Sequence, residues 1–100
     1  MNLLPLPLLI AAVKARKAVS FVYRGVRRTM EPHAVGIGHD GGAWISGYQT
    51  VGRELMPGQD WLYCSVDAVE SVEVTPTHFK RARPGYSRED SRFQRFFAAI

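Results

Sequence analysis

Two turn signals divide the stretch Tyr23–Gln49 into short strand-like runs, and this pattern constrains the fold more than any other feature of the sequence. Gly25 follows the β-branched and aromatic run VSFVYR, so it predicts a tight turn between two strands. The run HDGG at residues 39–42 predicts a second turn, because its Asp-Gly pair and the next glycine tolerate positive φ. The sequence therefore predicts consecutive antiparallel hairpins.

Pro32 lies inside the second predicted strand and predicts an irregularity there. Proline cannot donate a hydrogen bond to a β-ladder, so we expect an edge or a bulge that bends this strand sharply. In the third strand, AWISGYQT, a period of two places alternate residues on one face: Trp44, Ser46, Tyr48 and Thr50.

Two further runs, WLYCSV and VESVEVT, predict a fourth and a fifth strand at residues 61–66 and 69–75. Residues 51–60 contain glycine and proline and predict a loop. Five short strands without intervening helices predict a mainly β domain, with a strongly bent antiparallel sheet or a small barrel over residues 18–76.

An amphipathic helix is predicted at about residues 6–17. Four apolar residues recur at the spacing of one helical face: Leu6, Leu9, Ile10 and Val13. We expect this helix to cover the open face of the sheet, and docking of a partner is the alternative. The opening run MNLLPLPLLIAAV lacks the basic n-region of a signal peptide and is too short to span a bilayer. We therefore expect it to be part of the folded domain, not a targeting signal or a membrane span.

The tail at residues 77–100 is basic and irregular until it reaches the apolar run SRFQRFFAAI. Four large apolar residues recur there at helical spacing: Phe93, Phe96, Phe97 and Ile100. Asp90 with Ser91 supplies capping side chains, so the sequence predicts a C-terminal helical tail. Its apolar face needs cover, either on this domain or on another copy.

We expect the 100 residues to form one domain, 1–100. Cys64 is the only cysteine, which excludes an internal disulfide and favours a reducing, cytoplasmic location. Its place in a predicted strand is typical of a small buried hydrophobe. The net charge is +4, and three basic clusters, at residues 14–17, 24–28 and 80–83, suit phosphate, nucleic acid or an acidic partner. An ordinary solvated surface is the alternative.

No catalytic or metal-binding motif is present. The histidines His33, His39 and His78 lack the spacing of helical metal ligands, and the serines lie in no nucleophile-elbow pattern. The glycine-rich residues 36–42 lack the GxGxxG order that binds a pyrophosphate. The sequence therefore predicts no enzyme, no metal site and no cofactor.

The strongest binding pattern combines arginines with aromatic residues. The residues concerned are Arg24, Arg27 and Arg28 with Tyr23, Trp44, Tyr48 and Trp61. Arginine neutralises phosphate and an exposed ring stacks on a base, so the pattern favours a nucleotide or a short single-stranded nucleic acid. In a domain this small, each ring has an alternative role in the core.

The runs YRG, RRTMEPHAVG, GGAWISGYQ and WLYCSVDAV resemble, in their order and spacing, the WYL domain family. The likeness covers about residues 12–100, and the tail is similar to that of short, free-standing members. The resemblance implies an Sm-like small β-barrel. It also implies a bacterial module for ligand sensing in transcription regulation or phage defence, with nucleotides or single-stranded nucleic acid as ligands.

Six positions match the family pattern: Tyr23, Arg28, Pro32, His33, Trp44 and Tyr48. Of these, the resemblance makes Arg28 and His33 the best ligand candidates, and the matching Asp67 is expected to tie a turn. Leu62 and Ser65 stand where the family commonly has two arginines on the fourth strand. Because these bidentate phosphate donors are missing, three alternatives are open: weaker binding of nucleic acid or nucleotides, binding through other arginines, or no binding.

Our leading hypothesis is a non-enzymatic ligand-sensing or regulatory module that binds a nucleotide or a short single strand. The expected ligand-binding residues are Arg24, Arg28, His33, Trp44, Tyr48 and Arg53. The alternative is a protein-interaction or oligomerisation module without a nucleic-acid ligand, in which the C-terminal tail packs against another chain.

Overall fold

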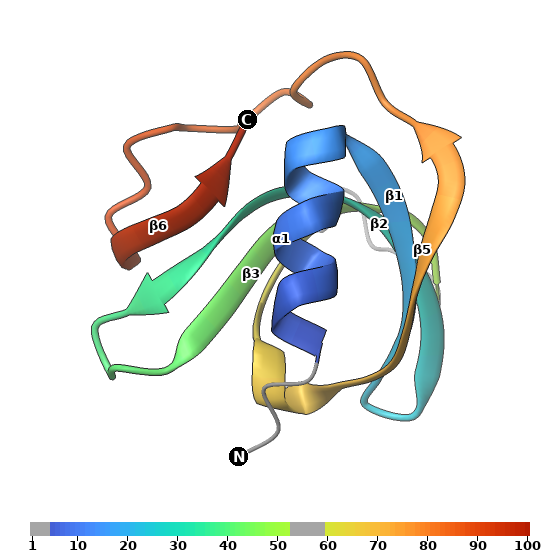
Figure 1. Ribbon diagram of the computed structural model, residues 1–100, viewed down its shortest axis with the longest axis horizontal. Helices are drawn as coiled ribbons and strands as arrows, with labels where there is room; N and C mark the ends of the chain where they lie inside the picture. The colour runs from blue at the N-terminus through green and yellow to red at the C-terminus, as the bar shows by residue number, and fades with distance from the viewer. Residues whose placement is uncertain (1–4, 53–59) are drawn as a thin grey trace.

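The computed structural model, which describes residues 5–52 and 60–100, contains one α-helix and six antiparallel strands (Figure 1). The elements are α1 (Pro5–Ala15), β1 (Lys17–Tyr23), β2 (Val26–Gly38), β3 (Ala43–Val51), β4 (Trp61–Ser65), the short 3₁₀ helix η1 (Val66–Ala68), β5 (Val69–His78) and β6 (Phe93–Ala99). The strand order is β4-β3-β2-β1-β5, and β6 pairs with β2.

The long strand β2 pairs with three other strands. Its first half pairs with β1 and its second half with β6, whereas β3 follows most of its length. A strand has only two edges, so β1 and β6 share one edge of β2 and β3 occupies the other. The register against β3 shifts between Pro32 and Ala34. On the opposite edge of β2, the partner changes from β1 to β6 in the same region. The predicted bulge at Pro32 is therefore confirmed.

Both predicted hairpin turns are confirmed. Arg24 (φ 51°) and Gly25 (φ 73°) join β1 to β2 in the left-handed conformations that a two-residue hairpin loop requires. Residues 39–42 join β2 to β3, and the Gly38 N–H donates to the Gly42 carbonyl oxygen at 2.9 Å. These two turns fix the register of the first three strands.

The hydrophobic core lies between α1 and the face of the sheet that carries Val19, Phe21 and Met30, which we call the inner face. Helix α1 packs against β1, β2 and β5 and lies across the curved sheet (Figure 1). It buries Pro5, Leu9, Ala12 and Val13. The predicted helix and its covering role are confirmed.

The helix ends earlier than the sequence predicts. Arg16 adopts a left-handed φ of 54°, and β1 begins at the next residue, Lys17. The Arg16 carbonyl oxygen accepts a hydrogen bond from the Phe79 N–H at 2.9 Å. The end of α1 is thus tied to the beginning of the C-terminal part of the chain.

The prediction of a C-terminal helical tail is wrong, because residues 93–99 form strand β6. Phe93 is 6% exposed and Phe97 is 37% exposed, so the residues predicted to form one apolar helical face are not buried together. The second half of β2 has a free edge beyond β1, and β6 satisfies its backbone hydrogen-bonding groups. Pairing with a distant strand overrides the local periodicity.

The sheet has six strands instead of the five predicted, and backbone pairing among the described residues leaves it unclosed between β4 and β5. The mainly β, antiparallel prediction is correct, whereas a closed barrel is not formed by the strand pairs. The loop predicted at residues 51–60 lies largely outside the described residues. No helix in the described ranges is long and apolar enough to cross a membrane.

Candidate ligand-binding face

Four aromatic side chains share the face of β3 and β4 opposite the core, which we call the outer face. Alternation along the two strands places Trp44 and Tyr48 of β3 beside Trp61 and Tyr63 of β4. Trp44 stacks on Tyr63 with ring centres 4.7 Å apart, and Tyr48 meets Trp61 edge-on at 5.7 Å. The predicted common face of Trp44 and Tyr48 is confirmed.

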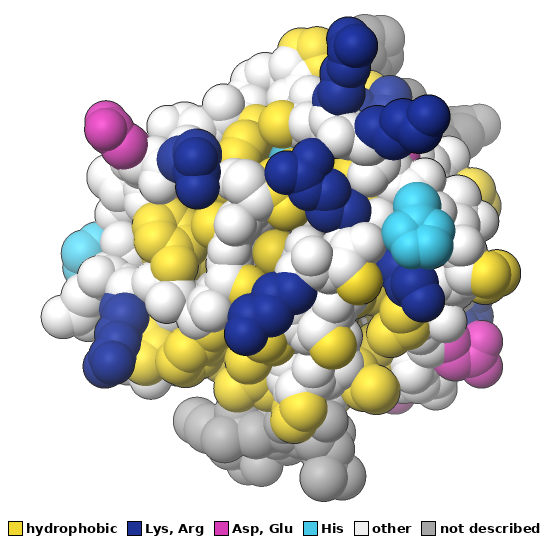
Figure 2. Space-filling model, turned by 45° about the horizontal axis from the view of Figure 1, so that its top comes forward, with side chains coloured by type: hydrophobic (Ala, Val, Ile, Leu, Met, Phe, Trp, Pro, Cys, Tyr) yellow, Lys and Arg dark blue, Asp and Glu magenta, His cyan; other side chains and the backbone are white. Residues whose placement is uncertain are grey.

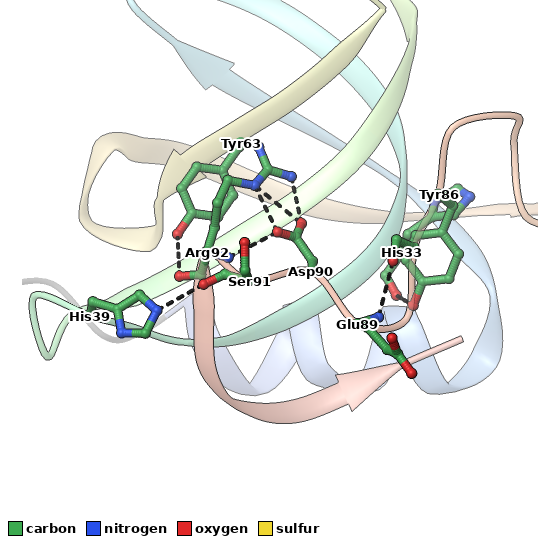
Figure 3. A network of polar contacts seen from close by, with 9 residues as sticks. His33, His39, Tyr63, Tyr86, Glu89, Asp90, Ser91 and Arg92 are labelled. Carbon is green, nitrogen blue, oxygen red and sulfur yellow. Dashed lines mark hydrogen bonds and ion pairs between the residues drawn. The ribbon is translucent and has the colours of Figure 1, made fainter.

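The chain between β5 and β6, which we call the 79–92 segment, crosses this outer face. The Arg83 guanidinium carbon lies 4.6 Å from the centre of the Tyr48 ring. The indole N–H of Trp61 donates to the Pro84 carbonyl oxygen at 3.1 Å. At the far end, the Arg92 guanidinium lies 4.2 Å from the Tyr63 ring (Figure 3). Each arginine is therefore placed over a ring at cation–π distance.

Two carboxylates hold these arginines in position. Glu31 accepts hydrogen bonds from Arg83 Nε at 2.7 Å and Nη2 at 3.1 Å, a bidentate pair. Asp90 pairs with Arg92 at 2.6 Å, and these hydrogen bonds keep the pKa of Asp90 below its ordinary value (Figure 3). The same contacts raise the pKa values of both arginines, which stay charged.

His33 lies at the bulge of β2 and is fully buried, with an exposed fraction of 0%. Its Nε2 accepts the Arg83 backbone N–H at 3.0 Å, and its Nδ1 lies 2.7 Å from the Glu31 carbonyl oxygen. A carbonyl oxygen only accepts, so this pattern requires a neutral ring protonated at Nδ1. Burial lowers the pKa of His33, which favours the same neutral form.

The predicted ligand contact at His33 does not fit this arrangement, because both ring nitrogens are already used. The ring also packs against three aromatic side chains: Trp61, Phe79 and Tyr86. His33 therefore fastens the 79–92 segment to the sheet.

Arg24 and Arg28 lie elsewhere, at the β1–β2 hairpin. Their guanidinium carbons are 5.2 and 5.3 Å from the centre of the Tyr23 ring. Arg28 shares the inner face with Met30, because the two alternate with Thr29 along β2. Its Nη1 donates to the buried side-chain oxygen of Gln49 at 2.9 Å.

The described members of the predicted site therefore lie in different parts of the fold. Trp44 and Tyr48 lie on the outer face, whereas Arg24 and Arg28 gather around Tyr23 at the end of the β1–β2 hairpin. Arg53 lies outside the described residues. Sequence reasoning left Tyr63, Arg83 and Arg92 out of the site. The alternation of Trp61 and Tyr63 was a usable signal, whereas nothing in the tail indicated that its arginines would cover them.

The 79–92 segment and β6 carry most of the net positive charge of the chain. Six of the thirteen Lys and Arg residues lie between Lys80 and Arg95, against two of the nine acidic residues. Four of these cations are exposed and form no ion pair with a described carboxylate: Lys80, Arg81, Arg88 and Arg95. On the side of the molecule seen in Figure 2, Lys and Arg are spread across the surface and acidic groups lie near its margin.

A hollow of about 420 Å³ opens beside this basic surface. It is lined by Glu31, Phe79, Lys80, Arg81, Ala82 and Arg83. Since Glu31 is already paired with Arg83, the charges at the hollow that lack a partner among the described carboxylates are positive. The hollow is therefore suited to an anionic group.

Other chemistry receives no support from the described residues. Cys64 is buried, and burial raises the pKa of its thiol to about 12, so it is an inert part of the core. No group of three or more His, Cys, Asp or Glu side chains in the described ranges is placed to hold a metal ion.

Comparison of the chain with protein-family models, with curated proteins and with solved structures found no match.

Proposed function

We propose that this chain is a non-enzymatic ligand-sensing or regulatory module that binds a nucleotide or a short single-stranded nucleic acid. One observation carries the proposal: exposed cations without an ion-pair partner among the described carboxylates lie along the 79–92 segment, and this segment crosses a row of aromatic rings. Single-stranded nucleic acid requires these two components, positive charge for phosphate and aromatic faces for bases.

The two kinds of arginine have different roles in this proposal. Arg83 and Arg92 are fixed by carboxylates and by rings, so they shape the face. Lys80, Arg81 and Arg88 form no ion pair with a described carboxylate and would neutralise phosphate, and Lys80 and Arg81 line the hollow of about 420 Å³. This assignment replaces Arg24 and Arg28 as the principal phosphate contacts.

The resemblance to the WYL domain points to the same ligand class. It would also make the bent sheet a variant of the Sm-like barrel and the protein a cytoplasmic bacterial regulator. The α1 helix followed by antiparallel strands is compatible with that fold.

A titration with fluorescently labelled oligo-dT at several salt concentrations tests the proposal. We expect saturable binding whose log affinity falls linearly with log salt, with a slope of about 0.7 per phosphate neutralised. The double variant Lys80→Gln/Arg81→Gln should bind more weakly and with a smaller slope. No binding of the unmodified protein at low salt would contradict the proposal.

The matched control removes the same charge from the β1–β2 hairpin, in the variant Arg24→Gln/Arg27→Gln. We expect it to bind nearly as well as the unmodified protein, because these arginines lie at the β1–β2 hairpin and line neither the hollow beside the 79–92 segment nor its row of rings. If this control loses affinity and the Lys80/Arg81 variant does not, the site lies at the hairpin.

The alternative function is association through β6. This strand pairs only with β2 among the described strands, and its Phe97 is 37% exposed. An open edge with an exposed aromatic ring can pair with another chain. Sedimentation over a range of protein concentrations tests this alternative: a mass that rises with concentration, and falls in Phe97→Ser, would support it.

A further inference from the structure

A second hollow, of about 310 Å³, lies at the turn between β2 and β3. It is lined by His39, Asp40, Trp44, Tyr63 and Arg92. The rings of Trp44 and Tyr63 are stacked, with planes 7° apart. A wall of stacked rings favours a flat ligand that extends the stack.

Hydrogen bonds fix the turn that forms one side of this hollow. The imidazole Nε2 of His39 contacts the Ser91 carbonyl oxygen at 2.8 Å (Figure 3). The carbonyl only accepts, so Nε2 carries the proton in this contact. The Tyr63 hydroxyl donates to the Arg92 carbonyl oxygen at 3.3 Å. The turn, β4 and the 79–92 segment thus form one preorganised wall.

Asp40 supplies the negative charge of the hollow. Its Oδ1 accepts hydrogen bonds from the Trp44 indole N–H at 2.9 Å and from the Gly42 backbone N–H at 3.0 Å. The indole hydrogen bond lowers the pKa of this carboxyl, so it is ionised at neutral pH. Its Oδ2 has no hydrogen-bond partner in the part of the chain that the structure describes. A carboxylate only accepts, so the hollow favours a ligand edge that donates.

We infer that this hollow receives a guanine base, at a subsite of the face proposed above to bind nucleotides. Guanine is flat and carries a ring N–H and an amino group side by side, so its edge can donate to Asp40 while its ring stacks on Trp44. Adenine and cytosine place a ring acceptor beside their amino group, and a carboxylate repels that acceptor. A phosphate is also disfavoured here by Asp40, so it lies on the basic 79–92 segment.

A guanidinium group of a partner peptide has a similar donor pattern and also stacks on rings. Two features favour the base. The chain carries a net charge of +4, which repels a basic peptide, and Arg92 itself lines the hollow. A neutral base joined to a phosphate is repelled neither by the net positive charge nor by Arg92.

The test compares three mononucleotides, GMP, IMP and AMP, by NMR titration of the Trp44 indole N–H signal, assigned with Trp44→Phe. IMP lacks only the amino group of guanine. We expect GMP to bind at least about tenfold tighter than IMP and AMP, the effect of one lost hydrogen bond to a charged group. Asp40→Asn should remove this preference while it keeps an oxygen for the Trp44 indole. Glu73→Gln, an exposed carboxylate on β5, is the matched control and should keep it.

The outcomes separate this inference from the proposed function. Binding of oligo-dT without a preference for GMP overturns the guanine subsite and leaves nucleic-acid binding intact. Failure of both oligo-dT and all mononucleotides overturns both. Binding of an arginine-rich peptide that shifts the Trp44 signal, with no shift from GMP, assigns the hollow to a protein partner and also overturns the subsite. The comparison of GMP with IMP needs no variant, so it stays decisive if Asp40→Asn does not fold.

Discussion

At the scale of single residues, His33 is a buried polar group held by several contacts. It is buried, uses both ring nitrogens and touches aromatic side chains from β4 and from the 79–92 segment. A proton on Nε2 would point at the Arg83 N–H, so the ring cannot become charged without losing that contact. The sequence resemblance predicted a ligand contact at this position, whereas the environment of the ring indicates a structural role.

The burial of His33 predicts a pH dependence of stability. Its pKa is lowered in the folded state from an ordinary value of 6.5, so above that pH both folded and unfolded forms are neutral at this residue. Below pH 6.5, this histidine binds a proton more readily in the unfolded chain than in the folded protein. The free energy of unfolding should therefore fall as the pH drops below about 6.5, by up to about 1.4 kcal/mol per pH unit.

Urea unfolding between pH 5 and 7.5 measures this slope, above the range where Asp40 and Asp90 titrate. The charged neighbours of His33 are Glu31, which favours its protonation, and Arg83 with Arg16, which oppose it. The control variant His39→Gln/His78→Gln leaves His33 as the only histidine and should keep the slope. A flat profile in that variant would show that His33 does not couple to folding.

Two glycines near the β2–β3 hairpin should respond differently to the same small substitution. A Cβ on Gly36 would overlap the Arg95 carbonyl oxygen of β6, whereas the nearest atoms to a Cβ on Gly42 would be those of the Asp40 side chain, at 3.5 Å. Gly36→Ala is expected to lower the free energy of unfolding by about 1–3 kcal/mol, as overpacking does. Gly42→Ala should change it by less than about 0.5 kcal/mol. Equal effects in chemical denaturation would argue against close packing of β6 on β2.

At the scale of elements, β6 illustrates what sequence reasoning could and could not find. The hairpins were predictable because Gly25 and the HDGG run are local signals, and α1 was predictable because its apolar spacing is local too. The partner of residues 93–99 is the second half of β2, far away in the sequence. The residues near Phe93 carry no signal that this edge of β2 is free, so the apolar spacing of the tail predicted a helix.

Two phenylalanines of β6 differ in burial and should respond differently to substitution. Phe93 is buried against Tyr63 and Phe96, whereas Phe97 is partly exposed. Phe93→Ala should lower the free energy of unfolding by about 3–5 kcal/mol, and Phe97→Ala by about 1 kcal/mol or less. Thermal and urea unfolding of both variants measure the difference. A larger effect at Phe97 would mean that its ring is covered in solution by another chain.

At the scale of the whole molecule, the two faces of the sheet separate residues that the sequence places close together. Arg28 and Trp44 belong to one predicted site, yet Arg28 faces inward to Gln49 and Trp44 faces outward to Tyr63. Alternation along each strand was predictable, but the relation between strands depends on registers and bulges. The aromatic half of the site was therefore predictable, whereas the cations that cover it were not.

The sharing of one edge of β2 by β1 and β6 also affects the order of events during synthesis. Strand β1 is available as soon as β2 is made, but β6 follows only after β3, β4, β5 and the 79–92 segment. Until then, half of β2 presents unpaired backbone groups to any extended chain nearby. We expect the nascent protein to be most prone to aggregation in this interval.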